Sequence, residues 1–501
     1  MEGTARRIGN AMAWSVAARG IRFLLGLVSS VVVVRGLGQH DYGVLSVVRS
    51  VLMFVIMLAG AGTGQALLKF LPAMRVVGSG VAARRLLRRV VLVHLTGWCV
   101  LVVVALAARH GTERLFHVDG IGVVVVAAVA LALFEILFTL AGQVLNASFE
   151  ARRLAFASTA SHTVYLGVLL VSLRGGLGVI DVLVAAAAGS AVACAIVAGR
   201  LRPSVDYGNA AGGEFGPGRI LRYSAPFAAI GILNLVVWRQ SEVLLLGHFR
   251  SPEETGYFDL AYRLPQTILE FVPGTVWPLV MAGMSEAFAR DRTSIRRAVD
   301  RYYRMLFVLC APICAMGAVL APRAVAVMFG EDMMPAAVPM QLFFLILTVS
   351  FLSTPLSMSL YVLEKTHINL VIYGALTVIN LGLDLLLIPK YGVFGAVVPV
   401  AIAIALQPLA YYLAARREIA GIGIPFAFIG RCFLASAAVV VALPVLHLFP
   451  GVPGLAAAGV VAGVAVVFAY REAGVLGGDE IDAVGAIPLP GSARLAAFFR
   501  K

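Results

Sequence analysis

Long apolar runs separated by short polar connections make up most of the chain. Residues 91–108 and 122–133, for example, carry no charged side chain. A run of about 20 apolar residues is long enough to cross the hydrocarbon core of a bilayer as an α-helix. Dividing the chain at charged and Pro/Gly-rich segments therefore predicts about 14 transmembrane helices. Their predicted ranges are 12–34, 43–69, 90–108, 121–146, 154–173, 178–199, 220–247, 256–286, 303–321, 336–362, 367–388, 393–414, 424–447 and 453–470.

The composition excludes a soluble globular protein. Of the 501 residues, 60% are hydrophobic and only 13% are charged, and the mean hydropathy is +0.94. A typical soluble domain is about 25% charged. Together with the long apolar runs, these values predict an all-α polytopic membrane protein.

The basic residues indicate the orientation of the chain rather than a nucleic-acid partner. Lys and Arg number 40 against 26 acidic residues, which gives a formal net charge of +14. In a soluble protein this excess would suggest nucleic-acid binding. Here most basic residues fall in every second connection between predicted helices, and such connections face the cytoplasm. We therefore expect cytoplasmic termini, contacts with membrane lipids and their anionic head groups, and no nucleic acid.

Two pairs of turns repeat along the chain. The turn LGQHDYG at 37–43 matches LGHFRSPEETG at 246–256, and SLRGGLGVID at 172–181 matches IPKYGVFGA at 388–396. Such repeats are typical of two bundles related by a pseudo-twofold axis along the membrane normal. We expect two pseudo-symmetric six-helix bundles plus two C-terminal helices. The predicted divisions are an N-terminal bundle at 1–200, a cytoplasmic linker at 201–219, a C-terminal bundle at 220–415, helices 13 and 14 at 416–470 and a cytoplasmic tail at 471–501.

Four segments around these turns carry a resemblance to a known family. They are RGLGQHDYG (35–43), LRYSAPFAAIGI (221–232), LLLGHFRSPEETGYFDLAYRL (244–264) and NLGLDLLLIPKYGVFGA (380–396). They are similar to the polysaccharide-transporter, or Wzx-type flippase, family of the MOP exporter superfamily, which also contains lipid II flippases and MATE exporters. The resemblance implies a V-shaped, two-bundle protein of the bacterial inner membrane. It also implies movement of an undecaprenyl-diphosphate-linked oligosaccharide between leaflets by alternating access.

Four arginines in or near the predicted spans point to an anionic substrate. Arg19 and Arg22 lie three residues apart in the first predicted helix. Arg49 lies in the second helix, and Arg263 lies near the matching depth of the eighth. An arginine inside a bilayer costs at least about 2.5 kcal/mol unless it meets water or a partner, and guanidinium groups bind pyrophosphate in a bidentate manner. Lipid II flippases carry cavity arginines on the same helices, so the resemblance supports substrate binding by these four. The alternative is that Arg19 and Arg22 reach the lipid head groups and that Arg263 is hydrated at the outer surface.

Other charged residues in the predicted spans are candidate counter-ions. Arg239 and Glu242 lie three residues apart in the seventh helix, so they can pair with each other. Glu135 in the fourth helix and Glu270 in the eighth are expected to be buried. Each could neutralise a cavity arginine or remain a protonated, hydrogen-bonded carboxyl.

Asn380 and Asp384 place an amide oxygen and a carboxylate one turn apart on the eleventh helix. Oxygen ligands suit hard monovalent cations. The pattern is similar to the sodium site of lipid II flippases, so the resemblance implies Glu242, Asn380 and Asp384 as cation-coupling residues. The twelfth helix departs from that pattern, because Ala396 and Val400 offer no hydroxyl ligand. Sodium coupling, proton coupling and the absence of coupling all stay open, as does a helix-capping role for Asp384.

These observations predict a flippase for a lipid-linked anionic oligosaccharide in surface polysaccharide biosynthesis. It would act without covalent chemistry, so we expect no enzyme and no cofactor. No metal is expected beyond a monovalent coupling cation, Na+ or H+, and a polysaccharide polymerase is a candidate partner. The alternative is a MATE-like, cation-coupled exporter of drugs or small molecules, whose cavity would favour acids and aromatics over arginines. The chain has no GxxxxGK[ST] segment, so ATP is not expected to drive it directly.

Overall fold

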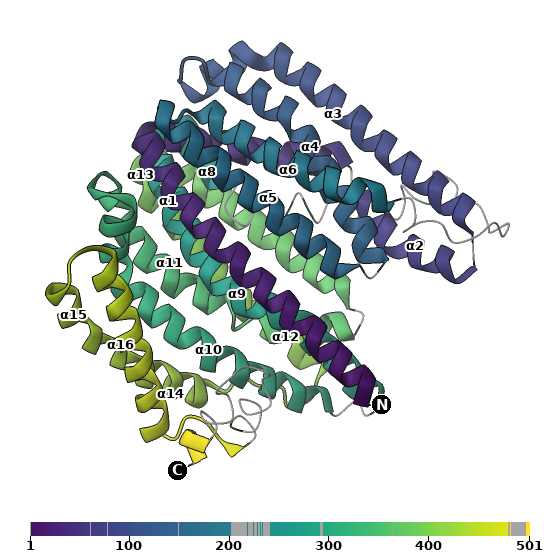
Figure 1. The fold of residues 1–501 in the computed structure, drawn as a ribbon. Helices are drawn as coiled ribbons and strands as arrows, with labels where there is room; N and C mark the ends of the chain where they lie inside the picture. The colour runs from purple at the N-terminus through teal and green to yellow at the C-terminus, as the bar shows by residue number, and fades with distance from the viewer. Residues whose placement is uncertain are drawn as a thin grey trace. The chain divides into compact units, whose positions relative to one another are not determined.

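The structure is a computed structural model, and the residues that it describes are almost entirely helical (Figure 1). It describes residues 2–60, 62–77, 79–148, 150–201, 241–290, 294–363, 365–478 and 497–500, and single positions at 218, 224, 228, 231, 233 and 481. The helices are α1 Glu2–Gly60, α2 Gly64–Val77, α3 Gly80–Phe116, α4 Ile121–Ala147, α5 Ala151–Ser172, η1 Leu173–Gly175, α6 Val179–Leu201, α8 Ser241–Phe249, α9 Pro252–Arg290, α10 Ser294–Ala324, η4 Val325–Phe329, η5 Glu331–Ala336, α11 Ala337–Ser350, α12 Thr354–Val362, α13 Thr366–Glu418, α14 Phe426–Ser436, η6 Ala437–Ala442, α15 Leu443–Leu448 and α16 Gly451–Glu472.

Ten helical segments in the described part of the chain are long and apolar enough to cross a membrane. Two of them, Arg19–Gly60 and His367–Glu418, each contain two helices joined at a kink. Hydrocarbon offers no hydrogen bonds to the backbone, and an α-helix satisfies its backbone groups internally. The prediction of an all-α polytopic membrane protein is therefore confirmed.

Two glycines make these kinks possible. Gly38 in α1 has a φ of 74°, and Gly392 in α13 has a φ of 55°. Side chains with a Cβ rarely adopt positive φ, whereas glycine does so readily. Both glycines fall in the repeated turns identified in the sequence, at 37–43 and 388–396. Those turns therefore mark real breaks between transmembrane helices.

The second predicted helix, 43–69, is wrong in its C-terminal part. α1 ends at Gly60 and α2 begins at Gly64. Between them Gly62 has a φ of 70°, and Thr63 Oγ1 donates a hydrogen bond to the Gly60 carbonyl at 2.7 Å. Glycine disfavours helix by about 1 kcal/mol relative to alanine. Gly60, Gly62 and Gly64 therefore interrupt the helix, although the apolar pattern predicted one continuous helix.

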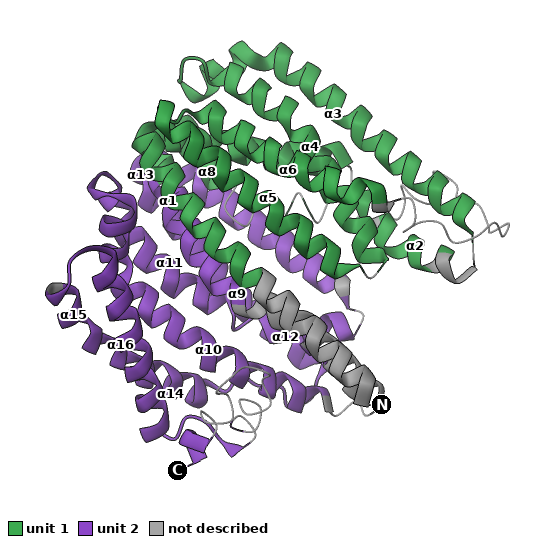
Figure 2. Ribbon diagram, viewed as in Figure 1, with its two compact units in different colours: residues 1–256 green, residues 257–501 purple. Residues whose placement is uncertain are grey.

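The chain divides into two compact units, Met1–Gly256 and Tyr257–Lys501 (Figure 2). In unit 1, α6 packs against α4 and α5, and α1 packs against α3, α4 and α5. In unit 2, α10 packs against α11 and α14, and α13 packs against α11 and α12. Most of the predicted linker at 201–219 lies outside the described residues, and the predicted domain boundaries stay a prediction.

Candidate functional site

Arg19 and Arg22 lie on one face of α1 in unit 1. Both residues are half-buried, and they are near enough to interact electrostatically. Two positive charges on an apolar span repel each other, and the low dielectric strengthens the repulsion. An anion bound at this face would relieve that repulsion.

Arg49 in α1 interacts with residues of two other helices of unit 1, α5 and α4. Its Nη2 donates a hydrogen bond to the hydroxyl of Tyr165 in α5 at 3.2 Å. The carboxylate of Glu135 in α4 lies within electrostatic range of the Arg49 guanidinium. The arginine is half-buried. A counter-ion role for Glu135 fits its position, and its burial stays a prediction. Tyr165 was not predicted; its only signal in the sequence is a polar aromatic within an apolar span.

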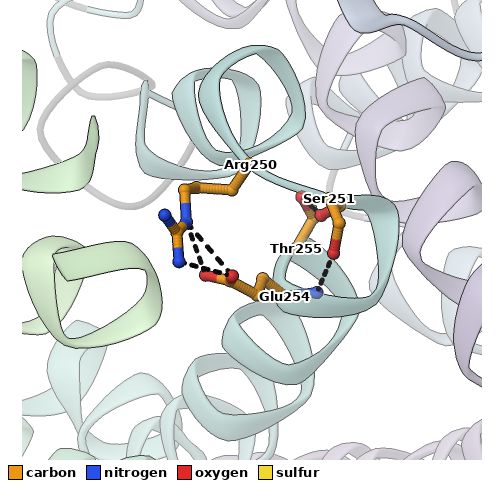
Figure 3. A network of polar contacts seen from close by, with 4 residues as sticks. All are labelled: Arg250, Ser251, Glu254 and Thr255. Carbon is orange, nitrogen blue, oxygen red and sulfur yellow. Dashed lines mark hydrogen bonds and ion pairs between the residues drawn. The ribbon is translucent and has the colours of Figure 1, made fainter. Parts of the chain in front are cut away.

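Polar contacts hold the start of α9 (Figure 3). The backbone N–H of Glu254 donates to Ser251 Oγ at 3.3 Å, and Thr255 Oγ1 donates to the Ser251 carbonyl at 2.9 Å. The Arg250 guanidinium pairs with the Glu254 carboxylate at 2.9 Å. Ser at the N-cap, Pro252 at the first helical position and Glu three residues after the cap form a strong helix start. This start defines the turn that matches 37–43 in the repeat.

The two matching turns contact each other within unit 1. His40 Nδ1 lies 2.7 Å from Glu253 Oε1. Gly43 and Gly256, equivalent in the repeat, meet backbone to backbone. A Cβ at Gly256 would lie 3.2 Å from the Gly43 nitrogen, and a Cβ at Gly43 would overlap the carbonyl group of Pro252. Only glycine leaves room for this contact.

Replacing Gly43 by alanine should therefore destabilise unit 1. Overpacking against a fixed backbone costs about 1–3 kcal/mol, so we expect the Gly43→Ala protein to unfold at a lower temperature in detergent. Gly111→Ala is the matched control, because a Cβ there meets nothing within 4 Å and alanine favours a helix interior by about 0.5–1 kcal/mol. Equal melting temperatures for Gly43→Ala and the wild type would contradict the contact.

The His40–Glu253 pair predicts a pH dependence of stability. Burial opposes the charge on Glu253, but hydrogen bonds from His40 and Ser251 outweigh it and hold the pKa of Glu253 below its ordinary value. A carboxyl with a lowered pKa stabilises the folded state above its unfolded pKa, about 4.3. This contribution is lost as the pH falls through the folded pKa. The melting temperatures of the wild type and Glu253→Gln should differ most at neutral pH and converge below about pH 4. The exposed Glu331→Gln serves as control, and a constant difference would refute the prediction.

Glu242 in α8 is fully buried. Ser241 Oγ donates a hydrogen bond to Glu242 Oε2 at 3.1 Å. Its predicted partner, Arg239, lies outside the described residues. A buried carboxylate in an apolar span is costly, which is consistent with the predicted functional role.

Asn380 and Asp384 are fully buried in the first half of α13, in unit 2. Neither atom of the Asn380 amide has a hydrogen-bond partner within the described residues, a condition that costs about 1–3 kcal/mol. Amide and carboxylate oxygens are ligands for hard cations. Asp384 lies inside a helix that continues to Gly392, so the alternative of a capping aspartate is wrong.

Arg263 forms an ion pair that was not predicted. Its Nε lies 3.4 Å from Oδ2 of Asp259, one turn earlier on α9, and Asp259 is only 2% exposed. The signal was present in the sequence, because residues four apart share a helical face. Glu270 is exposed and accepts a hydrogen bond from Gln266 Nε2 at 2.9 Å. The expected burial of Glu270 is therefore wrong.

The described candidate residues are divided between the two units. The structure brings together three sets of them within single units: Arg19 with Arg22, Arg49 with Glu135, and Asn380 with Asp384. Unit 1 contains Arg19, Arg22, Arg49, Glu135 and Glu242, and unit 2 contains Arg263, Glu270, Asn380 and Asp384.

Solved structures of membrane transporters share this fold. The lipid II flippase MurJ in an inward closed conformation has a TM-score of 0.69 at 14% identity, over 91% of this chain and 99% of that chain. An inward-facing multidrug resistance MATE family transporter of the MOP superfamily has a TM-score of 0.60 at 14% identity, over 82% and 98%. A mutant of the Vibrio cholerae MATE transporter VcmN has a TM-score of 0.59 at 15% identity, over 81% and 95%. At these identities the likeness shows the fold.

The sequence itself identifies the family. A search of curated protein sequences found no match. A family model described as "Polysaccharide biosynthesis protein" matches residues 32–338, which is more than half of the chain. The protein is therefore a multi-pass membrane protein that belongs to the polysaccharide biosynthesis protein family, as the resemblance predicted, and it shares its fold with solved structures of a lipid II flippase and of MATE transporters.

Proposed function

We propose that this protein is a flippase that moves an undecaprenyl-diphosphate-linked oligosaccharide across the bacterial inner membrane for surface polysaccharide biosynthesis. In this proposal both termini lie in the cytoplasm. The observation that carries it is Arg49, a half-buried arginine in an apolar span, held by the Tyr165 hydroxyl and in range of Glu135. Membership of a polysaccharide biosynthesis family and a fold shared with a lipid II flippase support the substrate class.

The arginines supply the chemistry that a diphosphate requires. A guanidinium group presents a planar fork of donors that matches phosphate oxygens and stays charged at any physiological pH. The hydrogen bond to Tyr165 orients the Arg49 fork before substrate arrives, which lowers the entropy lost on binding. Arg19, Arg22 and Arg263 are the other candidates for the diphosphate. No bond of the substrate is made or broken, since alternating access needs only binding and a change of conformation.

We further propose that Glu242, Asn380 and Asp384 couple transport to a monovalent cation, Na+ or H+. The three side chains are fully buried, and a buried carboxylate gains most from a bound cation or proton. The Asn380 amide, which lacks partners in the described part of the chain, would gain an oxygen–cation contact.

The decisive experiment measures the leaflet distribution of the lipid-linked sugar. In a deletion strain we expect the lipid-linked oligosaccharide to accumulate on the cytoplasmic face, and the plasmid-borne wild-type gene should restore export. An unchanged distribution would refute the flippase.

The fold shared with MATE transporters favours a drug exporter as second candidate. Increased drug sensitivity of the same strain, with normal sugar distribution, would support that rival. Co-purification of a polysaccharide polymerase would test the candidate partner.

A further inference from the structure

The first half of α13 carries a row of polar side chains on one face. Asn369, Tyr373, Asn380 and Asp384 follow one another at intervals of about one or two helical turns, so they share a face. Asn380 and Asp384 belong to the cation pair proposed above. Asn369, only 3% exposed, lies about 16 Å farther along the helix at 1.5 Å per residue. That distance is about half of the hydrocarbon thickness.

The second half of α13 adds two more buried polar side chains. Gln407 is 3% exposed and Tyr411 is fully buried, and they lie one turn apart. Tyr411 is near enough to Tyr373 to interact with it electrostatically, and also to Tyr361 of α12. The chain breaks at Gly392, midway between Tyr373 and Tyr411, so the two halves of α13 lie side by side at this level. We name Asn369, Tyr373, Gln407 and Tyr411 the α13 seam.

The α13 seam contains polar atoms without a hydrogen-bond partner in the part of the chain that the structure describes. Within the described residues, both amide atoms of Asn369 and the Gln407 Oε1 atom have no hydrogen-bond partner. A buried polar group without a hydrogen-bond partner destabilises the folded state. The same hairpin buries apolar residues, such as Leu376 and Ile404, so apolar side chains fit this environment and would avoid the cost.

The chemistry of the seam selects its ligand. It offers amide and hydroxyl oxygens without a formal charge, which suits water and a passing hard cation. A permanent cation site would instead need a carboxylate, and that group stands at Asp384. The composition of the seam is therefore typical of a pathway along which a cation moves, and not of a site that binds a cation tightly.

We propose that the α13 seam is a hydrated path for the monovalent coupling cation, between the Asn380–Asp384 pair and the end of the hairpin that carries Arg416 and Arg417. The proposal rests on the cation coupling proposed above. Ordinary helix packing is the competing explanation, in which the polar groups only bond neighbouring helices. Packing requires no access of water to the seam.

Cysteine labelling tests the path without any transport assay. In a full-length background with the native cysteines replaced, Asn369→Cys and Gln407→Cys are treated in proteoliposomes with methanethiosulfonate ethyltrimethylammonium, a water-soluble monovalent cation. The controls are the buried apolar Leu306→Cys in α10 and the exposed apolar Val371→Cys on the same helix as Asn369. We expect the seam cysteines to react at least about tenfold faster than both controls, because thiolates react only where water reaches them. Equal rates would overturn the proposal. The five native cysteines are Cys99, Cys194, Cys310, Cys314 and Cys432.

Apolar replacements test passage of the cation. Asn369→Leu and Gln407→Leu should melt at or above the wild-type temperature, because each removes an unsatisfied buried group, yet their transport should lose its acceleration by a cation gradient. A sodium gradient at fixed pH and a pH gradient without sodium separate the two cations. Stable leucine variants with unchanged acceleration would overturn the path. If wild-type transport responds to neither gradient, the proposal of cation coupling is refuted, and the proposal that a cation passes along the seam is refuted with it. Fast labelling of the seam cysteines would still show that water reaches the seam.

Discussion

Arg49→Gln should reduce transfer of the lipid-linked oligosaccharide between leaflets by about 10- to 150-fold at unchanged protein level. A hydrogen bond between charged groups contributes about 1.5–3 kcal/mol, and each 1.4 kcal/mol corresponds to a factor of ten. Glutamine keeps part of the side-chain length and polarity but removes the charge and the fork of donors. The measurement is the fraction of labelled lipid-linked sugar reaching the outer leaflet in cells that lack the native gene.

Three variants separate the role of Arg49 from a general loss of folding. Arg174→Gln alters an exposed arginine in η1 and should leave transfer unchanged. Arg49→Lys keeps the charge without the planar fork, so we expect an intermediate loss. Tyr165→Phe removes only the hydroxyl that positions Arg49, and its effect should be smaller than that of Arg49→Gln. Normal transfer by a normally expressed Arg49→Gln protein would refute substrate binding by this arginine.

Asp384→Asn should strongly weaken the response of transport to a cation gradient. The substitution keeps the shape of a fully buried side chain and removes its charge, which is what holds a cation or a proton. Even changes beside the direct ligands of a metal cost about 10- to 100-fold in affinity, so we expect at least about tenfold weaker dependence on the coupling cation. Reconstituted protein with a sodium gradient at fixed pH, or a pH gradient without sodium, provides the measurement.

The matched control for Asp384→Asn is Asp332→Asn. Asp332 is an exposed acid in η5 of the same unit, and its substitution should leave the response unchanged. Removing one buried carboxylate also removes a desolvation cost, so Asp384→Asn should remain folded. A variant that responds to both gradients as the wild type does would exclude Asp384 from coupling.

The apolar pattern predicted the helices well because the bilayer acts on each segment separately. A helix in hydrocarbon needs a fixed length of apolar residues and satisfies its own backbone, and neither condition depends on the rest of the fold. The breaks at Gly38 and Gly392 followed from glycines in repeated turns. The break after Gly60 was missed, because its alternate glycines lie within a run that is otherwise apolar.

The partners of the charged residues were predicted less well. Asp259 was recoverable, because it lies one turn from Arg263 on the same helix. Tyr165 was not recoverable, since it is 116 positions away from Arg49 and its helix had to be placed beside α1 first. The pairing of His40 with Glu253 could not be predicted for the same reason, because the two residues are 213 positions apart in the sequence.

By itself the sequence determined that the chain is helical, that it crosses a membrane many times and that its turns repeat. These properties are local, because hydropathy, glycine and proline act over one or two helical turns. Only the tertiary structure decided that Gly43 meets Gly256, that the Tyr165 hydroxyl accepts a hydrogen bond from Arg49, and that Asn369 and Gln407 are buried. These contacts depend on which helices pack together, and the cost of a buried polar atom is set by the neighbours that packing brings to it.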